Sequence, residues 1–235
     1  MKWSEFFTSS IGKKFVMGLT GLFLISFLVI HVGINACIWA NDNGEMFNKA
    51  AHFMGATVVI RIFEVGLFVG FILHIIQGLV LEFQNRNKRQ IGYRVRLGNR
   101  GSRWYSRSMG LLGTLVLLFL IMHLYHFWTP SRFGGIANIH ELDKVTYEDG
   151  KEIANLYAEI LKVFQGNLLV VLLYVAGCIS LAWHLMHGFQ SAFRSIGVYN
   201  NRYLKMANSV GIAFSIIVPL AFAMMPVSVY LDWIN

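Results

Sequence analysis

Residues 15–41 read FVMGLTGLFLISFLVIHVGINACIWAN and contain no Asp, Glu, Lys or Arg. A helix rises about 1.5 Å per residue, so about 20 apolar residues cross the roughly 30 Å hydrocarbon core of a bilayer. The segment follows Lys13 and Lys14 as a secretory signal would, but its apolar part is too long and no small-residue cleavage site follows near residues 35–39. We interpret it as a retained transmembrane helix.

Four further apolar segments follow along the chain. Residues 108–131, 163–193 and 206–231 contain no Asp, Glu, Lys or Arg, whereas the segment at 57–81 carries Arg61 and Glu64 near its start. None of the runs alternates as a transmembrane strand does, which argues against an outer-membrane barrel. Of the 235 residues, 56% are hydrophobic and 14% charged, unlike a soluble domain. We predict one all-α integral membrane domain, a five-helix up-down bundle, with spans at about 15–39, 57–81, 108–129, 166–190 and 208–231.

Basic residues are distributed unevenly between the predicted spans. The segment 82–107 holds eight Lys or Arg residues against the single acid Glu82, and residues 130–165 hold six acids against four bases. By the positive-inside rule, the N-terminus and the loop 82–107 are cytoplasmic, and the loop 130–165 and the C-terminus lie outside. This distribution accounts for the net charge of +8 without nucleic acid as a partner.

The basic loop 82–107 has two interpretations. It is either a topology signal that touches lipid headgroups, or a docking surface for a cytoplasmic partner, because it is longer than a turn requires.

Cysteine chemistry contributes little to this chain. The two cysteines, Cys37 and Cys178, lie in different apolar segments, so neither a disulfide framework nor a thiolate metal cluster can be built. We interpret both as packing residues.

The predicted spans contain six of the eight histidines. An imidazole in lipid costs free energy unless it is paired or ligated, so an intramembrane histidine indicates function. One alone is explained by a hydrogen bond to a neighbouring helix, but four successive helices each carry at least one. The six are His31, His74, His123, His126, His184 and His187.

Position along the helices sorts four of these histidines into pairs. His31 and His123 lie 17 and 16 residues from a basic residue at the cytoplasmic edge, or about 24–26 Å. His74 and His184 lie 12 and 10 residues from that edge, or about 15–18 Å. In an up-down bundle the first span then pairs with the third and the second with the fourth. Neutral imidazole binds iron well and no carboxylate or thiolate lies at these levels, so two bis-histidine haem sites are favoured over zinc or copper.

An internal repeat supports this choice. MGLTGLFLISFLVIH at 17–31 aligns without gaps with MGLLGTLVLLFLIMH at 109–123, which makes His126 the surplus histidine of the third span. HIIQG at 74–78 matches HLMHG at 184–188, which makes His187 the surplus histidine of the fourth.

Glycines accompany both halves of the repeat. The glycine four residues after His74 or His184 lies one turn along the same face, where it leaves room for a planar macrocycle near the backbone. Close packing of helices explains such glycines equally well. That second interpretation applies also to Gly18, Gly21, Gly110 and Gly113.

Four motifs carry a family resemblance: SSIGKKF at 9–15, TGLFLISFLVIH at 20–31, HLYHF at 123–127 and HLMHGFQSAFRSIG at 184–197. With them the chain resembles, over essentially its full length, the cytochrome b membrane anchor of the succinate:quinone oxidoreductases. The similarity is to the branch that uses a single five-helix, two-haem anchor.

The resemblance implies the anchor of respiratory complex II, an enzyme of the tricarboxylic acid cycle, in the bacterial cytoplasmic (inner) membrane. A flavoprotein and an iron–sulfur subunit would dock on the cytoplasmic face, and this chain would pass electrons between them and a quinone, preferably menaquinone, without containing the succinate site. Succinate oxidation and fumarate reduction both stay open as the direction. His187 is an alternative ligand, because some relatives place a histidine directly before the glycine. The implied axial ligands of two haem b are His31, His74, His123 and His184.

Charged residues within and beside the spans suggest further contacts. Arg61 and Glu64 lie one turn apart, where they either neutralise each other or serve a proton or quinone near the outer haem. Haem propionates need cationic or hydroxyl partners. Candidates near helix ends are Ser10, Lys13, Lys14, Arg107 and Arg194.

Two other functions remain alternatives. The cytochrome b anchor of a hydrogenase or formate dehydrogenase would share the bis-histidine chemistry but serve another catalytic partner. A haem-free transporter would use the histidines as a proton relay, and its preparation would be colourless.

Overall fold

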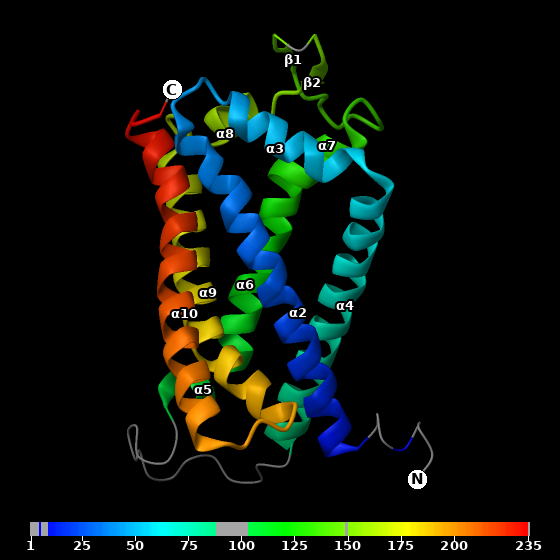
Figure 1. The fold of residues 1–235 in the computed structure, drawn as a ribbon, viewed down its shortest axis with the longest axis vertical. Coiled ribbons are helices and arrows are strands. Elements are labelled where there is room, and N and C mark those ends of the chain that lie inside the picture. The colour runs from blue at the N-terminus through cyan, green and yellow to red at the C-terminus, as the bar shows by residue number, and fades with distance from the viewer. Residues whose placement is uncertain (1–4, 6–8, 88–102, 149, 235) are drawn as a thin grey trace. The chain divides into compact units, whose positions relative to one another are not determined.

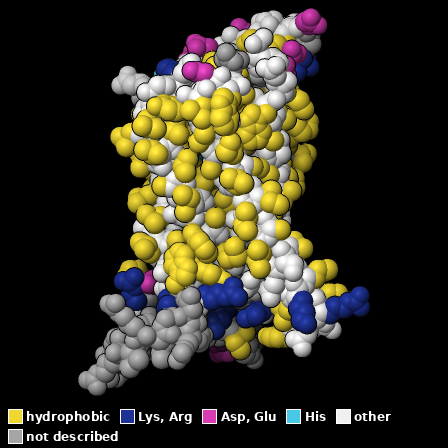
Figure 2. Space-filling model, turned by 90° about the vertical axis from the view of Figure 1, so that its left-hand side faces the viewer, with side chains coloured by type: hydrophobic (Ala, Val, Ile, Leu, Met, Phe, Trp, Pro, Cys, Tyr) yellow, Lys and Arg dark blue, Asp and Glu magenta, His cyan; other side chains and the backbone are white. Residues whose placement is uncertain are grey.

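The computed structural model describes residue 5 and residues 9–87, 103–148 and 150–234. Within them, five helical segments are long and apolar enough to cross a membrane, so the predicted multi-pass helical character is confirmed. Hydrophobic side chains cover much of the helical surface seen in Figure 2. The long helices, labelled in Figure 1, are α2 (Ser10–Ala36), α4 (Val58–Asn87), α6 (Met109–His123), α9 (Leu168–Ser195) and α10 (Asn201–Tyr230).

Two of these helices continue in non-α turns. The 3-10 turn η1 (Cys37–Ala40) extends α2, and α6 runs through the π-helical turn η2 (Leu124–Trp128) into α7 (Thr129–Phe133). The helices α4, α9 and α10 also extend beyond the predicted spans, to Asn87, to Ser195 and back to Asn201. Hydropathy marks only the part of a helix that lies in hydrocarbon, whereas backbone hydrogen bonding continues into the polar flanks.

The chain divides into two compact units, and each of the five long helices passes from one to the other. Unit 1 comprises Met1–Leu28, Val65–Thr114 and Ser180–Ile217, and unit 2 comprises Val29–Glu64, Leu115–Ile179 and Val218–Asn235.

In unit 1, small residues allow α2 to approach its neighbours. A Cβ added at Gly70 of α4 would lie 2.9 Å from the Phe23 ring on α2, so that ring packs directly against the α4 backbone. The short helix α5 (Trp104–Arg107) packs on α9, where the rings of Tyr105 and Trp183 stack with centroids 5.6 Å apart. Most of the predicted cytoplasmic loop, residues 88–102, lies outside the described residues.

Unit 2 contains elements that the sequence analysis did not assign. They are α3 (Glu45–Ala56), the antiparallel strands β1 (Lys144–Thr146) and β2 (Glu152–Ala154), and α8 (Leu156–Phe164). Helix α3 contacts both α8 and β2 (Figure 1). These segments are amphipathic, so a search for long uncharged runs passes over them.

A buried asparagine joins these elements of unit 2. Asn48 of α3 is 1% exposed and donates from Nδ2 to the Tyr147 hydroxyl and to Asn155 Oδ1, both at 2.9 Å. Its Oδ1 accepts from the backbone N–H of Tyr157, and Asn155 caps α8 by accepting from Ala158 N at 3.0 Å. Both hydrogens and the oxygen of the buried Asn48 amide are therefore paired, which stabilises this part of the unit.

Candidate functional site

Unit 2 brings His31 of α2 and His123 of α6 together. Their ring centres lie 5.7 Å apart and the ring planes are inclined by 86°. Asn35, one turn after His31, donates from Nδ2 to the His31 carbonyl at 2.8 Å, and this amide nitrogen also lies 3.3 Å from His31 Nδ1. The Phe222 ring of α10 packs 5.5 Å from the His31 ring.

Aromatic side chains enclose His123. Phe119, one turn before it, stacks on the imidazole at 5.8 Å, and Phe127, one turn after it, lies 5.5 Å away. Tyr174 of α9 approaches it edge-on at 6.3 Å. The orientation of this ring is set by packing against aromatic neighbours.

Unit 1 brings His74 of α4 and His184 of α9 together. Their ring centres lie 6.2 Å apart, with an angle of 66° between the ring planes. The structure therefore joins the first span with the third and the second with the fourth, as the spacing analysis expects.

A threonine sets the hydrogen bonding of His74. Thr20 of α2 is 9% exposed, and its hydroxyl donates to the Val16 carbonyl at 2.8 Å. Its oxygen lies 3.2 Å from His74 Nδ1. Because the hydroxyl proton is already used, this oxygen accepts from Nδ1–H, which leaves the Nε2 lone pair for a metal. The sequence analysis did not identify Thr20, although it stands where the second half of the repeat has Leu112.

The glycines of the repeat have two different roles. A Cβ at Gly21 would lie 3.6 Å from His74 Cε1, and one at Gly113 would lie 3.5 Å from His184 Cε1. The equivalent glycines one turn earlier pack helices instead: a Cβ at Gly18 would lie 3.2 Å from the Ala192 carbonyl, and one at Gly110 would meet the Glu82 carboxylate. Gly18 and Gly110 therefore lie where helices pack closely, and Gly21 and Gly113 lie beside the imidazoles of unit 1.

The glycines that follow the unit 1 histidines also differ. A Cβ at Gly188 would meet no atom within 4 Å, whereas one at Gly78 would lie 3.2 Å from the Met17 methyl group. The α9 backbone at Gly188 therefore has open space beside it. The α4 backbone at Gly78 is instead covered by the flexible side chain of Met17.

Among the described residues, two of the four paired histidines have an Nδ1 atom that is buried without a hydrogen-bond partner. They are His123 and His184, the members from α6 and α9. The repeat explains this asymmetry, since Thr20 and Asn35 of the first half correspond to Leu112 and Phe127 in the second. An unsatisfied buried nitrogen costs free energy, so these imidazoles are expected to serve a ligand.

The geometry of both pairs fits haem iron. Two imidazoles on opposite sides of one metal ion, each with a metal–nitrogen bond of about 2 Å, have ring centres about 6 Å apart. The observed separations are 5.7 Å and 6.2 Å. Each pair has two imidazoles, the number of ligands that a six-coordinate haem would take from protein.

The surplus histidines occupy other environments. His126 lies in η2, where its Nδ1 is 2.9 Å from the Tyr174 hydroxyl and its ring stacks on that of Tyr174. His187, the alternative ligand, is partly buried on α9, and the ring that faces His74 is that of His184.

The intramembrane charged group is larger than the predicted Arg61–Glu64 pair. Arg61 lies 3.7 Å from Glu64, but Arg132 donates from Nε to Glu64 Oε1 at 2.9 Å and Trp128 donates to the same oxygen at 2.7 Å. The nearest cation to Glu64 is thus Arg132, which α7 brings from the end of the third span. Gly55 makes room for it, since a Cβ there would lie 2.9 Å from the guanidinium.

The residues proposed to contact propionates are gathered in one unit. Lys13 donates to Gln84 Oε1 at 3.3 Å, and Lys14, Arg107 and Arg194 are exposed. Ser10, Lys13, Lys14, Arg107 and Arg194 all belong to unit 1.

No protein-family model, curated protein or solved structure matches this chain. The assignment of function therefore rests on the residues and on the geometry of the two histidine pairs.

Proposed function

We propose that this chain is the dihaem cytochrome b anchor of a succinate:quinone oxidoreductase. The observation that carries the proposal is the pairing of His31 with His123 and of His74 with His184, at ring separations of 5.7 Å and 6.2 Å on apolar helices. Haem b at each pair would supply reversible one-electron chemistry.

The chain's own residues would bind, orient and insulate the two groups. In unit 1, Thr20 would hold the Nδ1 proton of His74 and leave Nε2 to bind haem iron, and Gly21 and Gly113 place no side chain beside the imidazoles. In unit 2, the rings of Phe119 and Phe127 hold His123 in place. Apolar helices exclude water from both pairs.

Glu64 is the residue we assign to proton exchange with a quinone. Its carboxylate is 17% exposed and accepts from Trp128 and Arg132, and Arg61 lies beside it. A positioned carboxylate of this kind can receive or release the proton that quinone chemistry requires. Replacement by Gln keeps the size of the side chain and removes this ability, so Glu64→Gln is expected to lower quinone turnover while haem content stays unchanged.

Orientation and partners follow from the charge distribution. With the N-terminus inside and the C-terminus outside, the basic segments would face the cytoplasm of a bacterium, where the flavoprotein and the iron–sulfur subunit would dock. The succinate site would lie in the flavoprotein, and menaquinone is the preferred quinone. This chain would then be a non-catalytic electron-transfer subunit.

One preparation tests the proposal. The complex is purified through this chain, and a dithionite-reduced minus oxidised spectrum with pyridine haemochrome quantitation counts haem b. Two haem b per chain with co-purified flavin and iron–sulfur protein is the expected result. Nickel or molybdenum in the complex would favour a hydrogenase or formate dehydrogenase anchor, and a colourless preparation would rule out a cytochrome.

A further inference from the structure

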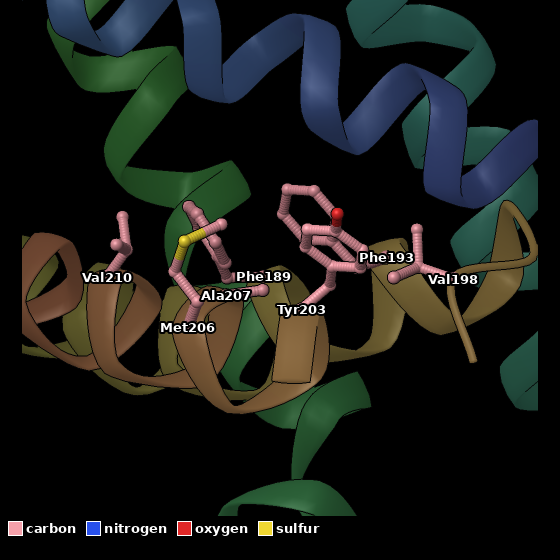
Figure 3. Close-up of a pocket in the computed structure, with 7 residues that line it drawn as sticks. All are labelled: Phe189, Phe193, Val198, Tyr203, Met206, Ala207 and Val210. Atoms are coloured by element: carbon pink, nitrogen blue, oxygen red, sulfur yellow. The ribbon is translucent and has the colours of Figure 1, made fainter. Parts of the chain in front are cut away.

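An apolar groove lies in unit 1 where α9 ends and α10 begins. It has a volume of about 340 Å³. Figure 3 shows Phe189 and Phe193 of α9 beside Tyr203, Met206 and Val210 of α10. The histidine pairs contribute no side chain to the lining, so the groove is separate from the site described above.

The groove has the length and surface of a site for a hydrocarbon chain. Tyr203, Met206 and Val210 follow one another at helical spacing, and they are 57%, 60% and 54% exposed. From Tyr203 to Val210 the helix rises about 10 Å, so the groove accommodates part of an acyl chain within one leaflet. Phe189, 7% exposed, forms the floor.

Three cations are sequence neighbours of lining residues at the end of α9 and the start of α10. Arg194 follows Phe193 directly, Arg202 precedes Tyr203, and Lys205 lies one residue before Met206. All three are exposed, residues 190–205 contain no acid, and none of the three forms an ion pair within the described part of the chain. The helix ends that form the groove thus also carry positive charge that no acid within residues 190–205 compensates.

We propose that this groove binds an anionic phospholipid, with one acyl chain along Tyr203, Met206 and Val210 and the phosphate near Arg202 and Lys205 at the start of α10. Basic pockets between transmembrane helices on the cytoplasmic side recognise anionic headgroups in this way. Charge complementarity selects this ligand over phosphatidylcholine, whose headgroup has no net charge. A quinone is disfavoured because its carbonyl oxygens need donors, whereas the lining offers only the Tyr203 hydroxyl.

Native mass spectrometry of the purified full-length chain tests the proposal, with phosphatidylglycerol and phosphatidylcholine of the same acyl chains as probes. We expect phosphatidylglycerol to bind more tightly by about tenfold or more, since each cation near the headgroup contributes. The double variant Arg202→Gln/Lys205→Gln is expected to lose most of this preference. Equal binding of the two lipids to the natural chain would overturn the proposal.

A bulky substitution that fills the groove is the second test of the proposal. Met206→Trp places a bulky ring in the acyl-chain path and should weaken both lipids, whereas Ile216→Trp, at another exposed position of α10, should bind them as the natural chain does. Circular dichroism and monodispersity show whether each variant is folded. If Met206→Trp does not fold, the exposed Gln substitutions still test the proposal. If Met206→Trp is folded and retains phosphatidylglycerol unchanged, or if menaquinone displaces it, the groove is not a phospholipid site.

Discussion

The histidine pair of unit 1 is bordered by glycine and a hydroxyl group, whereas the pair of unit 2 is enclosed by aromatic rings. The Thr20 oxygen lies 3.2 Å from His74 Nδ1, and a Cβ added at Gly21 or Gly113 would reach the ring of His74 or His184. In unit 2, Phe119 and Phe127 pack against His123 instead.

The side chains beside the rings therefore differ: the Thr20 oxygen lies at His74 Nδ1, the Asn35 amide nitrogen lies at His31 Nδ1, and aromatic rings pack on His123. A hydrogen bond to Nδ1 determines both the tautomer and the ring angle, whereas aromatic packing determines only the angle. Small changes near Thr20 should therefore affect the unit 1 haem alone, and the comparison can be tested by measuring the two haems separately.

Removal of an axial ligand should have the largest effect. His74→Ala is expected to reduce haem from two per chain to about one and to spare the unit 2 haem, because the iron loses one of its two protein ligands. His31→Ala should do the converse. Pyridine haemochrome assay and redox titration of the remaining haem distinguish the two, and full haem content in both variants would refute the ligand assignment.

The surplus histidines supply the controls for these variants. His126→Ala and His187→Ala should retain two haem b with low-spin spectra, since neither ring belongs to a pair in the structure. Loss of the unit 1 haem in His187→Ala, with retention in His184→Ala, would instead identify His187 as the ligand.

Replacing a glycine beside the unit 1 histidines by a bulky residue should have the second largest effect. Gly113→Leu is expected to lower occupancy of the unit 1 haem severalfold, because a Cβ at this position already reaches van der Waals distance from His184 Cε1. The matched control is Gly66→Leu on α4, where a Cβ would meet no atom within 4 Å. The measurement is haem content per chain. Equal haem content in the Gly113→Leu and Gly66→Leu variants would mean that Gly113 does not adjoin the haem.

Loss of the Thr20 hydroxyl should have a smaller effect. Thr20→Val keeps the volume and removes the partner of His74 Nδ1, so we expect haem retention in unit 1 to weaken about tenfold or more, with a shift of its midpoint potential. Thr114→Val is the control, because the Thr114 hydroxyl also donates to the carbonyl four residues earlier, at 2.8 Å, with no histidine beside it. A shift confined to the unit 2 haem would contradict the assignment.

The weakest effect is expected at the surplus histidine of unit 2. Tyr174→Phe removes the hydroxyl that lies 2.9 Å from His126 Nδ1, which should lower the free energy of unfolding by ~1 kcal/mol. Both haems should remain, because aromatic packing against His123 is kept. Thermal unfolding and the reduced spectrum give the two readouts, and loss of the unit 2 haem would show that the hydroxyl contributes to the binding site.

The five long apolar helices and the four paired histidines could be predicted from the sequence. Both depend on local quantities: the hydropathy of a continuous segment decides whether it enters lipid, and a constant rise per residue places each histidine along its helix. The helix ends were less predictable, since α4 continues to Asn87 and α10 begins at Asn201. A helix ends where its backbone hydrogen bonds stop, and hydropathy does not mark that point.

Only the tertiary structure decided which side chains accompany the histidines and the carboxylate. Thr20 reaches His74 from 54 residues away in sequence, and Arg132 reaches Glu64 from 68. Such contacts depend on the rotation of one helix against another, and the π-helical turn at 124–128 changes that rotation for everything after it, including Trp128 and Arg132. Single hydrogen bonds contribute only about 1 kcal/mol each, so no local pattern in the sequence encodes them.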